Sequence, residues 1–143
     1  FYETLHYHFH LDKKQARNKA KTLLNQVLLD ESILEKYPFE LSGGMAQRVM
    51  IALTLSLQPD LILADEPTSS LDVVSQKQLL DLLLDLKKQT TIDLVTHNIQ
   101  VAKYLADQIV VIKDGRIIEQ GKASQILTSP THPYTKSLIM KGQ

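Results

Sequence analysis

The sequence LILADEPTSSLD, residues 61–72, gives the strongest indication of the fold class of this chain. Its first five residues, 61–65, form a short apolar run that ends in an acid, with a proline on each side. Such a run is typical of a strand buried in a parallel sheet. The carboxyl end of that strand is where open α/β folds place ligands, so we expect Asp65 and Glu66 at a binding site.

Two adjacent carboxylates at a strand end can divide the work of phosphoryl transfer. One can hold Mg²⁺, directly or through water, while the other orients and deprotonates an attacking water. The alternative is a solvated strand end, since acidic residues often end strands. Residues 67–72, which follow directly, favour the first interpretation. A leucine-rich helix over 73–88 and a second strand over 91–96 predict a parallel α/β sheet with right-handed crossovers.

The segment LSGGMAQR, residues 41–48, precedes this strand and carries a second pattern typical of phosphate binding. Ser42 is a good N-cap for a helix over 43–57, which is apolar nearly all round and is expected to be largely buried. Gly43 and Gly44 would let the backbone approach an anion that the helix N-terminus favours. An ordinary serine-capped helix with a glycine-rich entry is the alternative.

His97 follows the second strand on the side of the sheet where the carboxylates emerge. An imidazole there can hydrogen-bond a terminal phosphate and an attacking water; a structural histidine is the alternative. The alternating His6, His8 and His10 invite a metal interpretation, but strand-like spacing in a terminal segment supports it weakly.

The remaining segments predict further helices and one hairpin. Asp114-Gly115 marks the turn between two apolar strands. The expected elements are helices over 12–29 and 100–106, strands over 108–112 and 116–119, and a tail of short helices over 122–143.

Composition excludes several classes of protein. The 143 residues include 16 Lys and Arg and 16 Asp and Glu, so the formal net charge is zero. The chain therefore lacks the excess of basic residues that is typical of nucleic-acid-binding domains. The chain has no cysteine, which excludes a disulfide framework, a thiolate metal site and a cysteine nucleophile. No apolar run approaches the length of a transmembrane helix.

The three motifs, in this order, resemble the ATP-binding subunits of ABC transporters: 41–48 the signature motif, 61–72 the Walker B segment and D-loop, and 94–97 the switch-histidine loop. The resemblance implies an α/β P-loop NTPase fold and the cofactors ATP and Mg²⁺. It also implies that Asp65 is associated with magnesium, that Glu66 is the general base, and that His97 senses the γ-phosphate. Six further residues would bind ATP held by the opposite subunit or contact that subunit: Ser42, Gly43, Gly44, Gln47, Ser69 and Asp72.

Individual residues within and after the motifs indicate one branch of this family. Met45 in the signature and the tail sequence HPYTKSL, residues 132–138, resemble importers of oligopeptides, dipeptides and nickel. Asn98 departs from the Asp usual in this branch, and no catalytic group is lost by it. The branch implies a second ATPase subunit, transmembrane permease subunits, an extracytoplasmic solute-binding protein acting indirectly, and a place on the cytoplasmic face of the membrane.

A P-loop, with the pattern G-x-x-x-x-G-K-[ST], is absent. The only Gly-Lys pair is Gly121-Lys122, and Arg116 stands where the first glycine would be needed. We therefore expect a partial ATPase fold from a longer subunit: 1–58 as part of the helical signature subdomain, 59–121 as the C-terminal part of the ATPase core, and 122–143 as an importer-type tail. Such a piece would be marginally stable, with uncovered apolar sheet edges, and inactive alone.

Two other functional classes stay open. A soluble ABC-type protein that acts on ribosomes or DNA would share this site, although the tail sequence favours an importer. A non-catalytic interaction module that has lost its P-loop would have no physical need for Glu66 or His97.

Overall fold

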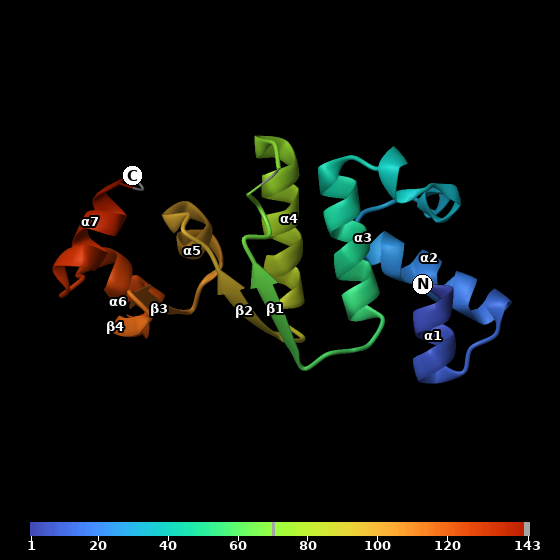
Figure 1. Cartoon of the computed structure of the whole chain (residues 1–143), viewed down its shortest axis with the longest axis horizontal. Coiled ribbons are helices and arrows are strands. Elements are labelled where there is room, and N and C mark those ends of the chain that lie inside the picture. The colour runs from blue at the N-terminus through green and yellow to red at the C-terminus, as the bar shows by residue number, and fades with distance from the viewer. Residues whose placement is uncertain (70, 142–143) are drawn as a thin grey trace. The chain divides into compact units, whose positions relative to one another are not determined.

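A computed structural model describes residues 1–69 and 71–141 (Figure 1). Ser70, in the predicted D-loop, and the last two residues of the predicted tail lie outside the described part. The chain divides into two compact units, Phe1–Asp93 and Leu94–Gln143, each described by itself below. The predicted division at 58/59 and 121/122 stays a prediction.

The first unit begins with helices that pack side by side. A capping box starts the second of them, because Asp12 accepts a hydrogen bond from the Gln15 N–H at 2.8 Å and Gln15 accepts one from the Asp12 N–H at 3.0 Å. Neighbouring pairs are α1 with α2, α2 with α3, and α3 with α4 (Val73–Leu86). The helices are α1 (Tyr2–Phe9), α2 (Lys13–Gln26), the 3₁₀ turns η1 (Glu31–Glu35) and η2 (Pro38–Glu40), and α3 (Gly43–Leu55).

Residues 61–65 form the strand that the sequence predicts. The strands β1 (Leu61–Asp65) and β2 (Thr91–Val95) make a two-stranded sheet, and Figure 1 draws both arrows in the same direction, as expected for a parallel pair. The helix α4 (Val73–Leu86) connects them. Strand β2 begins beside the start of β1, where the Thr91 N–H donates to the Asp60 carbonyl at 3.0 Å.

The core of the first unit lies between its helices. Several leucine side chains on α2 and α4 are fully or nearly fully buried, and Leu5 of α1 and Val27, directly after α2, join them. The largest buried side chains of this unit are Leu5, Leu24, Val27, Leu79 and Leu83.

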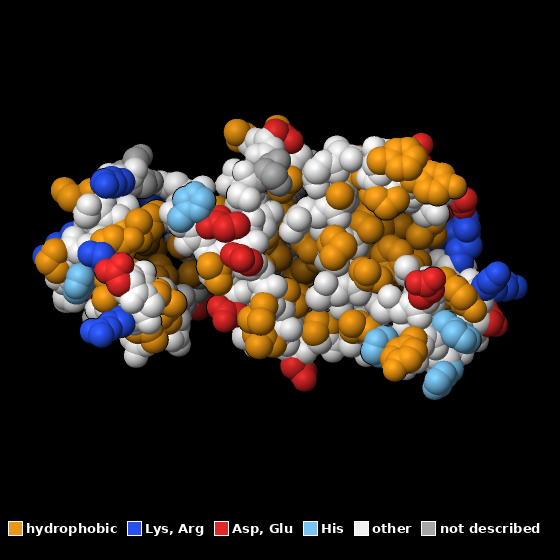
Figure 2. Space-filling model, in the orientation of Figure 1, with side chains coloured by type: hydrophobic (Ala, Val, Ile, Leu, Met, Phe, Trp, Pro, Cys, Tyr) orange, Lys and Arg blue, Asp and Glu red, His pale blue; other side chains and the backbone are white. Residues whose placement is uncertain are grey.

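Two burial predictions are wrong in this unit. Within α3 only Ala52 is buried, and Met50 is exposed, because α3 contacts neighbours on some of its faces and not all round. In β1 only Ile62 is buried, and Leu63 is 73% exposed. Figure 2 shows hydrophobic side chains reaching the surface over β1 and over the segment before α3. Leu63 and Val95 are both exposed, and the predicted uncovered sheet edges stay a prediction.

The second unit is a hairpin with helices against it. Asp114 and Gly115 have φ of +50° and +72°, the left-handed pair that a tight hairpin turn requires, so the predicted turn is confirmed. The strands pair antiparallel, with a register shift between Val111 and Ile112, and α6 contacts both. The elements are α5 (Ile99–Leu105), β3 (Gln108–Lys113), β4 (Arg116–Lys122), α6 (Ala123–Thr128) and α7 (Pro133–Lys141).

The carboxylate of Glu119 connects the hairpin to the predicted tail through hydrogen bonds. Glu119 of β4 accepts hydrogen bonds from the N–H groups of Thr131 and His132, at 2.7 and 3.1 Å, directly before α7. The Lys113 ammonium lies 4.9 Å from the centre of the Tyr134 ring, a cation–π contact. The tail is therefore part of the packed second unit.

The N-terminal histidines do not form the strand-like array that a metal interpretation needs. His6 and His8 lie in α1, His10 ends it with φ of +55°, and His6 Nδ1 lies 2.9 Å from the Leu11 carbonyl. Among the described residues, no three His, Cys, Asp or Glu side chains could together hold a metal ion. In the same part of the chain, no helix is long and apolar enough to cross a bilayer.

Candidate functional site

The signature segment forms the exposed N-terminus of α3. The Ser42 hydroxyl oxygen accepts a hydrogen bond from the Met45 N–H at 3.3 Å, which confirms the predicted N-cap. Ser42 and Gly43 are exposed. A helix of this length with an open N-terminus offers free N–H groups and a positive dipole end, so it fits a phosphate group.

Gly44 faces its own chain more than solvent. A Cβ placed on it would lie 3.1 Å from both Cβ and Oγ of Ser75, on α4, and 3.8 Å from Leu71 Cδ2. Contacts of 3.1 Å to a Cβ are tighter than nine in ten real ones, so Ser75 would have to shift by a few tenths of an ångström to admit a side chain at 44. The glycine therefore allows close packing of α3 on the start of α4, a use that the motif alone did not reveal.

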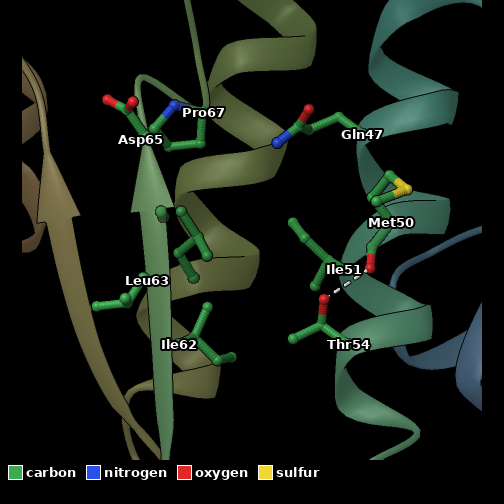
Figure 3. Close-up of a pocket in the computed structure, with 10 residues that line it drawn as sticks. Gln47, Met50, Ile51, Thr54, Ile62, Leu63, Asp65 and Pro67 are labelled. Atoms are coloured by element: carbon green, nitrogen blue, oxygen red, sulfur yellow. Dashed lines mark hydrogen bonds between the residues drawn. The ribbon is translucent and has the colours of Figure 1, made fainter.

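Gln47 and Asp65 line one cavity between α3, β1 and α4, with a volume of about 180 Å³ (Figure 3). Figure 3 shows the Gln47 side chain extending from α3 toward the end of β1, where Pro67 stands. The Asp65 carboxylate is directed away from α3 in the same view. The other lining residues are mainly apolar: Met50, Ile51, Thr54, Ile62, Leu63, Ala64 and Leu83.

The carboxylate of Asp65 is exposed at the end of β1. Magnesium in nucleotide sites keeps several waters and takes only one or two protein carboxylates together with phosphate oxygens. A single exposed carboxylate at a strand end fits such an ion, and the residues present therefore suit the implied cofactor.

A turn follows β1 directly, and Glu66 is its first residue. Its φ of +43° lies in the left-handed region, which is uncommon for a residue with a side chain. The Ser69 N–H and the Ser69 hydroxyl both donate to the Glu66 carbonyl, at 3.2 and 3.1 Å, and this turn holds the conformation. Backbone strain of this kind clusters at functional sites and costs on the order of 1–3 kcal/mol, so it supports a functional role for Glu66.

Asp72 caps α4 and binds Ser75 with both carboxylate oxygens. Oδ1 accepts from the N–H groups of Val74 and Ser75, each at 3.0 Å, and Oδ2 accepts from the Ser75 hydroxyl at 2.6 Å. The Ser75 hydroxyl and then the Ser75 N–H hold the pKa of Asp72 below its ordinary value. The residue predicted to contact another subunit is thus also bound inside its own chain.

His97 follows β2 in the second unit and is exposed. Asn98, the departure from the branch pattern, is the N-cap of α5: its Oδ1 accepts from the Gln100 N–H at 2.9 Å. The first unit therefore brings together the signature helix, Gln47, Asp65, Glu66, Ser69 and Asp72, and His97 belongs to the other unit. The roles assigned to these residues stay predictions.

The comparisons with known proteins agree with the fold and the motifs. Residues 2–69 match the family model described as ABC transporter. The chain is 45% identical to the oligopeptide transport ATP-binding protein AppD of Bacillus subtilis (strain 168), an alignment that covers 96% of this chain and 43% of AppD. It is 41% identical to the glutathione import ATP-binding protein GsiA of Escherichia coli (strain K12), covering 96% of this chain and 23% of GsiA.

Solved structures show the same fold. The dimeric, post-hydrolysis ATP-binding cassette MJ0796, bound to ADP and Pi, superimposes with a TM-score of 0.69 at 35% identity, over 79% of this chain and 49% of that one. An inward-facing putative metal-chelate type ABC transporter gives a TM-score of 0.80 at 26% identity, over 97% of this chain and 56% of that one. The chain thus spans about half or less of the lengths of these relatives. It belongs to the family of ABC transporter ATP-binding domains, with part of their P-loop NTPase fold.

Proposed function

We propose that this chain is the signature-bearing and carboxylate-bearing part of an ATPase that energises an ABC importer of short peptides. The observation that carries the proposal is the first unit, in which the exposed N-terminus of α3 and the carboxylates that end β1 belong to one compact body. The oligopeptide and glutathione importers among its relatives support peptides as the solute. Nickel is the alternative solute within the same branch.

The N-terminus of α3 would serve a nucleotide held by a second ATPase subunit. Ser42 and Gly43 are exposed and present N–H groups to its phosphates, while Gln47 extends from the next turn of the helix. Gly44 keeps this end of the helix free of a side chain. Ser69 and Asp72 lie in the turn after β1 and would contact the second subunit there.

The carboxylates after β1 would carry the hydrolysis of a nucleotide bound beside them. Asp65 would hold Mg²⁺, which supplies neutralisation of phosphate charge. Glu66 would orient a water and accept its proton as the water oxygen bonds to the γ-phosphorus and ADP leaves. His97 would hydrogen-bond the terminal phosphate and keep the water in line.

The proposed assembly follows from the branch. Two ATPase subunits, identical or related, would bind transmembrane permease subunits on the cytoplasmic face of the membrane, and an extracytoplasmic solute-binding protein would act through the permease. The zero charge balance argues against a nucleic-acid partner.

The test asks whether residues 41–48 complete a nucleotide site in trans. The chain is mixed with an ATPase relative that has an intact P-loop and whose own signature serine is replaced by arginine, and MgATP turnover is measured. We expect turnover that depends on the chain and persists with the control Ser137→Ala, an exposed serine on α7. Absence of turnover from a chain that is folded by circular dichroism would favour a non-catalytic module.

A further inference from the structure

The start of α4 joins two motifs that the proposed function uses separately. On one side, the Cβ and Oγ of Ser75 occupy the space where a Gly44 side chain would lie, each 3.1 Å from that position. On the other side, Ser75 donates two hydrogen bonds to Asp72, from its N–H at 3.0 Å and from its hydroxyl at 2.6 Å. One serine thus contacts both the signature helix and the D-loop aspartate.

Further contacts connect Asp72 to the turn that begins at Glu66. Leu71, the residue before Asp72, packs toward Gly44, and its N–H donates to the Thr68 carbonyl at 3.2 Å. Thr68 is buried, and its neighbour Ser69 binds the Glu66 carbonyl. A displacement of α3 at Gly44 would therefore reach the backbone that carries Glu66 through a short series of direct contacts.

A second contact one turn further along fixes how the two helices align. Arg48 of α3 donates a hydrogen bond to the Gln78 side chain of α4. Figure 1 shows α3 and α4 side by side, in agreement with their contacts. Because the alignment is held at this second point, the position of Ser75 against Gly44 is defined by the packing of the two helices.

We propose that Ser75 is a positioning residue of the ATPase: its contact with Gly44 and its hydrogen bonds to Asp72 set the position of the D-loop relative to the signature helix. Ser75 itself touches neither nucleotide nor the attacking water. Its hydroxyl restrains the Asp72 carboxylate, and its Cβ restrains the approach of the two helices. This inference rests on the proposed function, because the motifs it links are those of the ATPase.

The first test is Ser75→Ala in the mixture of this chain with the P-loop-intact relative. Alanine keeps the Cβ against Gly44 and removes only the hydroxyl that binds Asp72. We expect kcat to fall at least about fivefold, within the loss of roughly 100-fold that misplacement away from the chemistry can cause, while KM for MgATP stays constant. The control Ser137→Ala removes a hydroxyl from an exposed position on α7.

The second test is a double-mutant cycle between Gly44 and Ser75. Gly44→Ala is expected to lower kcat when Ser75 is present, because the new Cβ meets the serine. In the Ser75→Gly background, Gly44→Ala is expected to lower kcat by less than half of that loss, because the serine side chain is no longer there. Equal losses in the two backgrounds would overturn the proposed contact, because Gly44 would then act through the phosphates alone.

The outcomes separate this inference from the proposed function. If the unsubstituted chain supports turnover and Ser75→Ala leaves kcat unchanged, the positioning role is wrong and the ATPase proposal stands. If Ser75→Ala lowers the helical circular dichroism signal in proportion to kcat, the serine is only structural, which also overturns the inference. If the unsubstituted chain supports no turnover at all, both proposals fail.

Discussion

The N–H and the hydroxyl of Thr131 both donate to one oxygen of the Glu119 carboxylate, at 2.7 and 2.8 Å. This pair joins the hairpin of the second unit to the segment that starts α7. The donors stabilise the charged carboxylate, above all the Thr131 N–H, and lower the pKa of Glu119 from 4.5 to about 2.

The lowered pKa predicts an acid-sensitive tail. Because the folded-state pKa lies below the unfolded one, the contribution of Glu119 to stability is present above pH 4.5 and is lost as the pH falls toward 2. We expect the thermal unfolding temperature of the chain to fall as the pH is lowered from 4.5 toward 2. In the Glu119→Gln variant, the fall over this pH range is expected to be smaller. The matched control is Glu3→Gln on α1, and an equal reduction in that variant would contradict the prediction.

Local sequence patterns predicted the elements that carry the motifs. The apolar run at 61–65, the Asp114-Gly115 turn and the Ser42 cap each depend on neighbouring residues, and each is present in the structure. The family was predicted in the same way, from ordered motifs. Helix α1 was missed because the alternating His6, His8 and His10 suggested strand-like spacing in this short segment.

Contacts between distant residues could not be read from those patterns. The sequence shows Gly44 as a phosphate-binding glycine, and nothing near it indicates that Ser75 fills the space beside it. Likewise, the sequence around Glu119 does not indicate that the Thr131 N–H, 12 residues later, donates to its carboxylate. The exposure of Leu63 was missed because a local apolar run predicts a strand but does not say which of its faces is covered.

Replacing Glu66 by Gln is expected to stop turnover while ATP still binds, in a two-subunit ATPase that carries this sequence. The amide keeps the size of the side chain but cannot accept the proton of the attacking water, and loss of a general base costs roughly 10²–10⁴-fold. Turnover and ATP-dependent dimer formation by size-exclusion chromatography are the measurements. Turnover at the original rate would show that Glu66 is not the base.

Replacing His97 by Ala is expected to lower turnover more than nucleotide affinity, because a hydrogen bond to the terminal phosphate matters most as the charge on that phosphate redistributes. Turnover of bound ATP and equilibrium ATP titration measure the two effects separately. Weaker binding combined with unaltered turnover of bound ATP would contradict this role.

Replacing Gly44 by Asp is expected to prevent ATP-driven dimerisation for two reasons. The carboxylate places a negative charge at the helix end that must approach phosphates, and its Cβ would lie 3.1 Å from Ser75. Gly121→Asp adds the same charge on β4 and serves as the control. ATP-dependent dimers of the Gly44 variant, at the concentration that suffices for the original chain, would refute the assignment of residues 41–48.

A pair of leucine substitutions tests how the first unit is packed. Leu24 on α2 is fully buried, whereas Leu63 on β1 is 73% exposed. Leu24→Ala is expected to lower the free energy of unfolding by about 2–5 kcal/mol, through lost burial and the cavity left behind. Leu63→Ala is expected to change it by about 0.5 kcal/mol or less, as is usual for exposed positions. Urea unfolding followed by circular dichroism measures both, and a loss at Leu63 as large as that at Leu24 would show that the outer face of β1 is covered in solution.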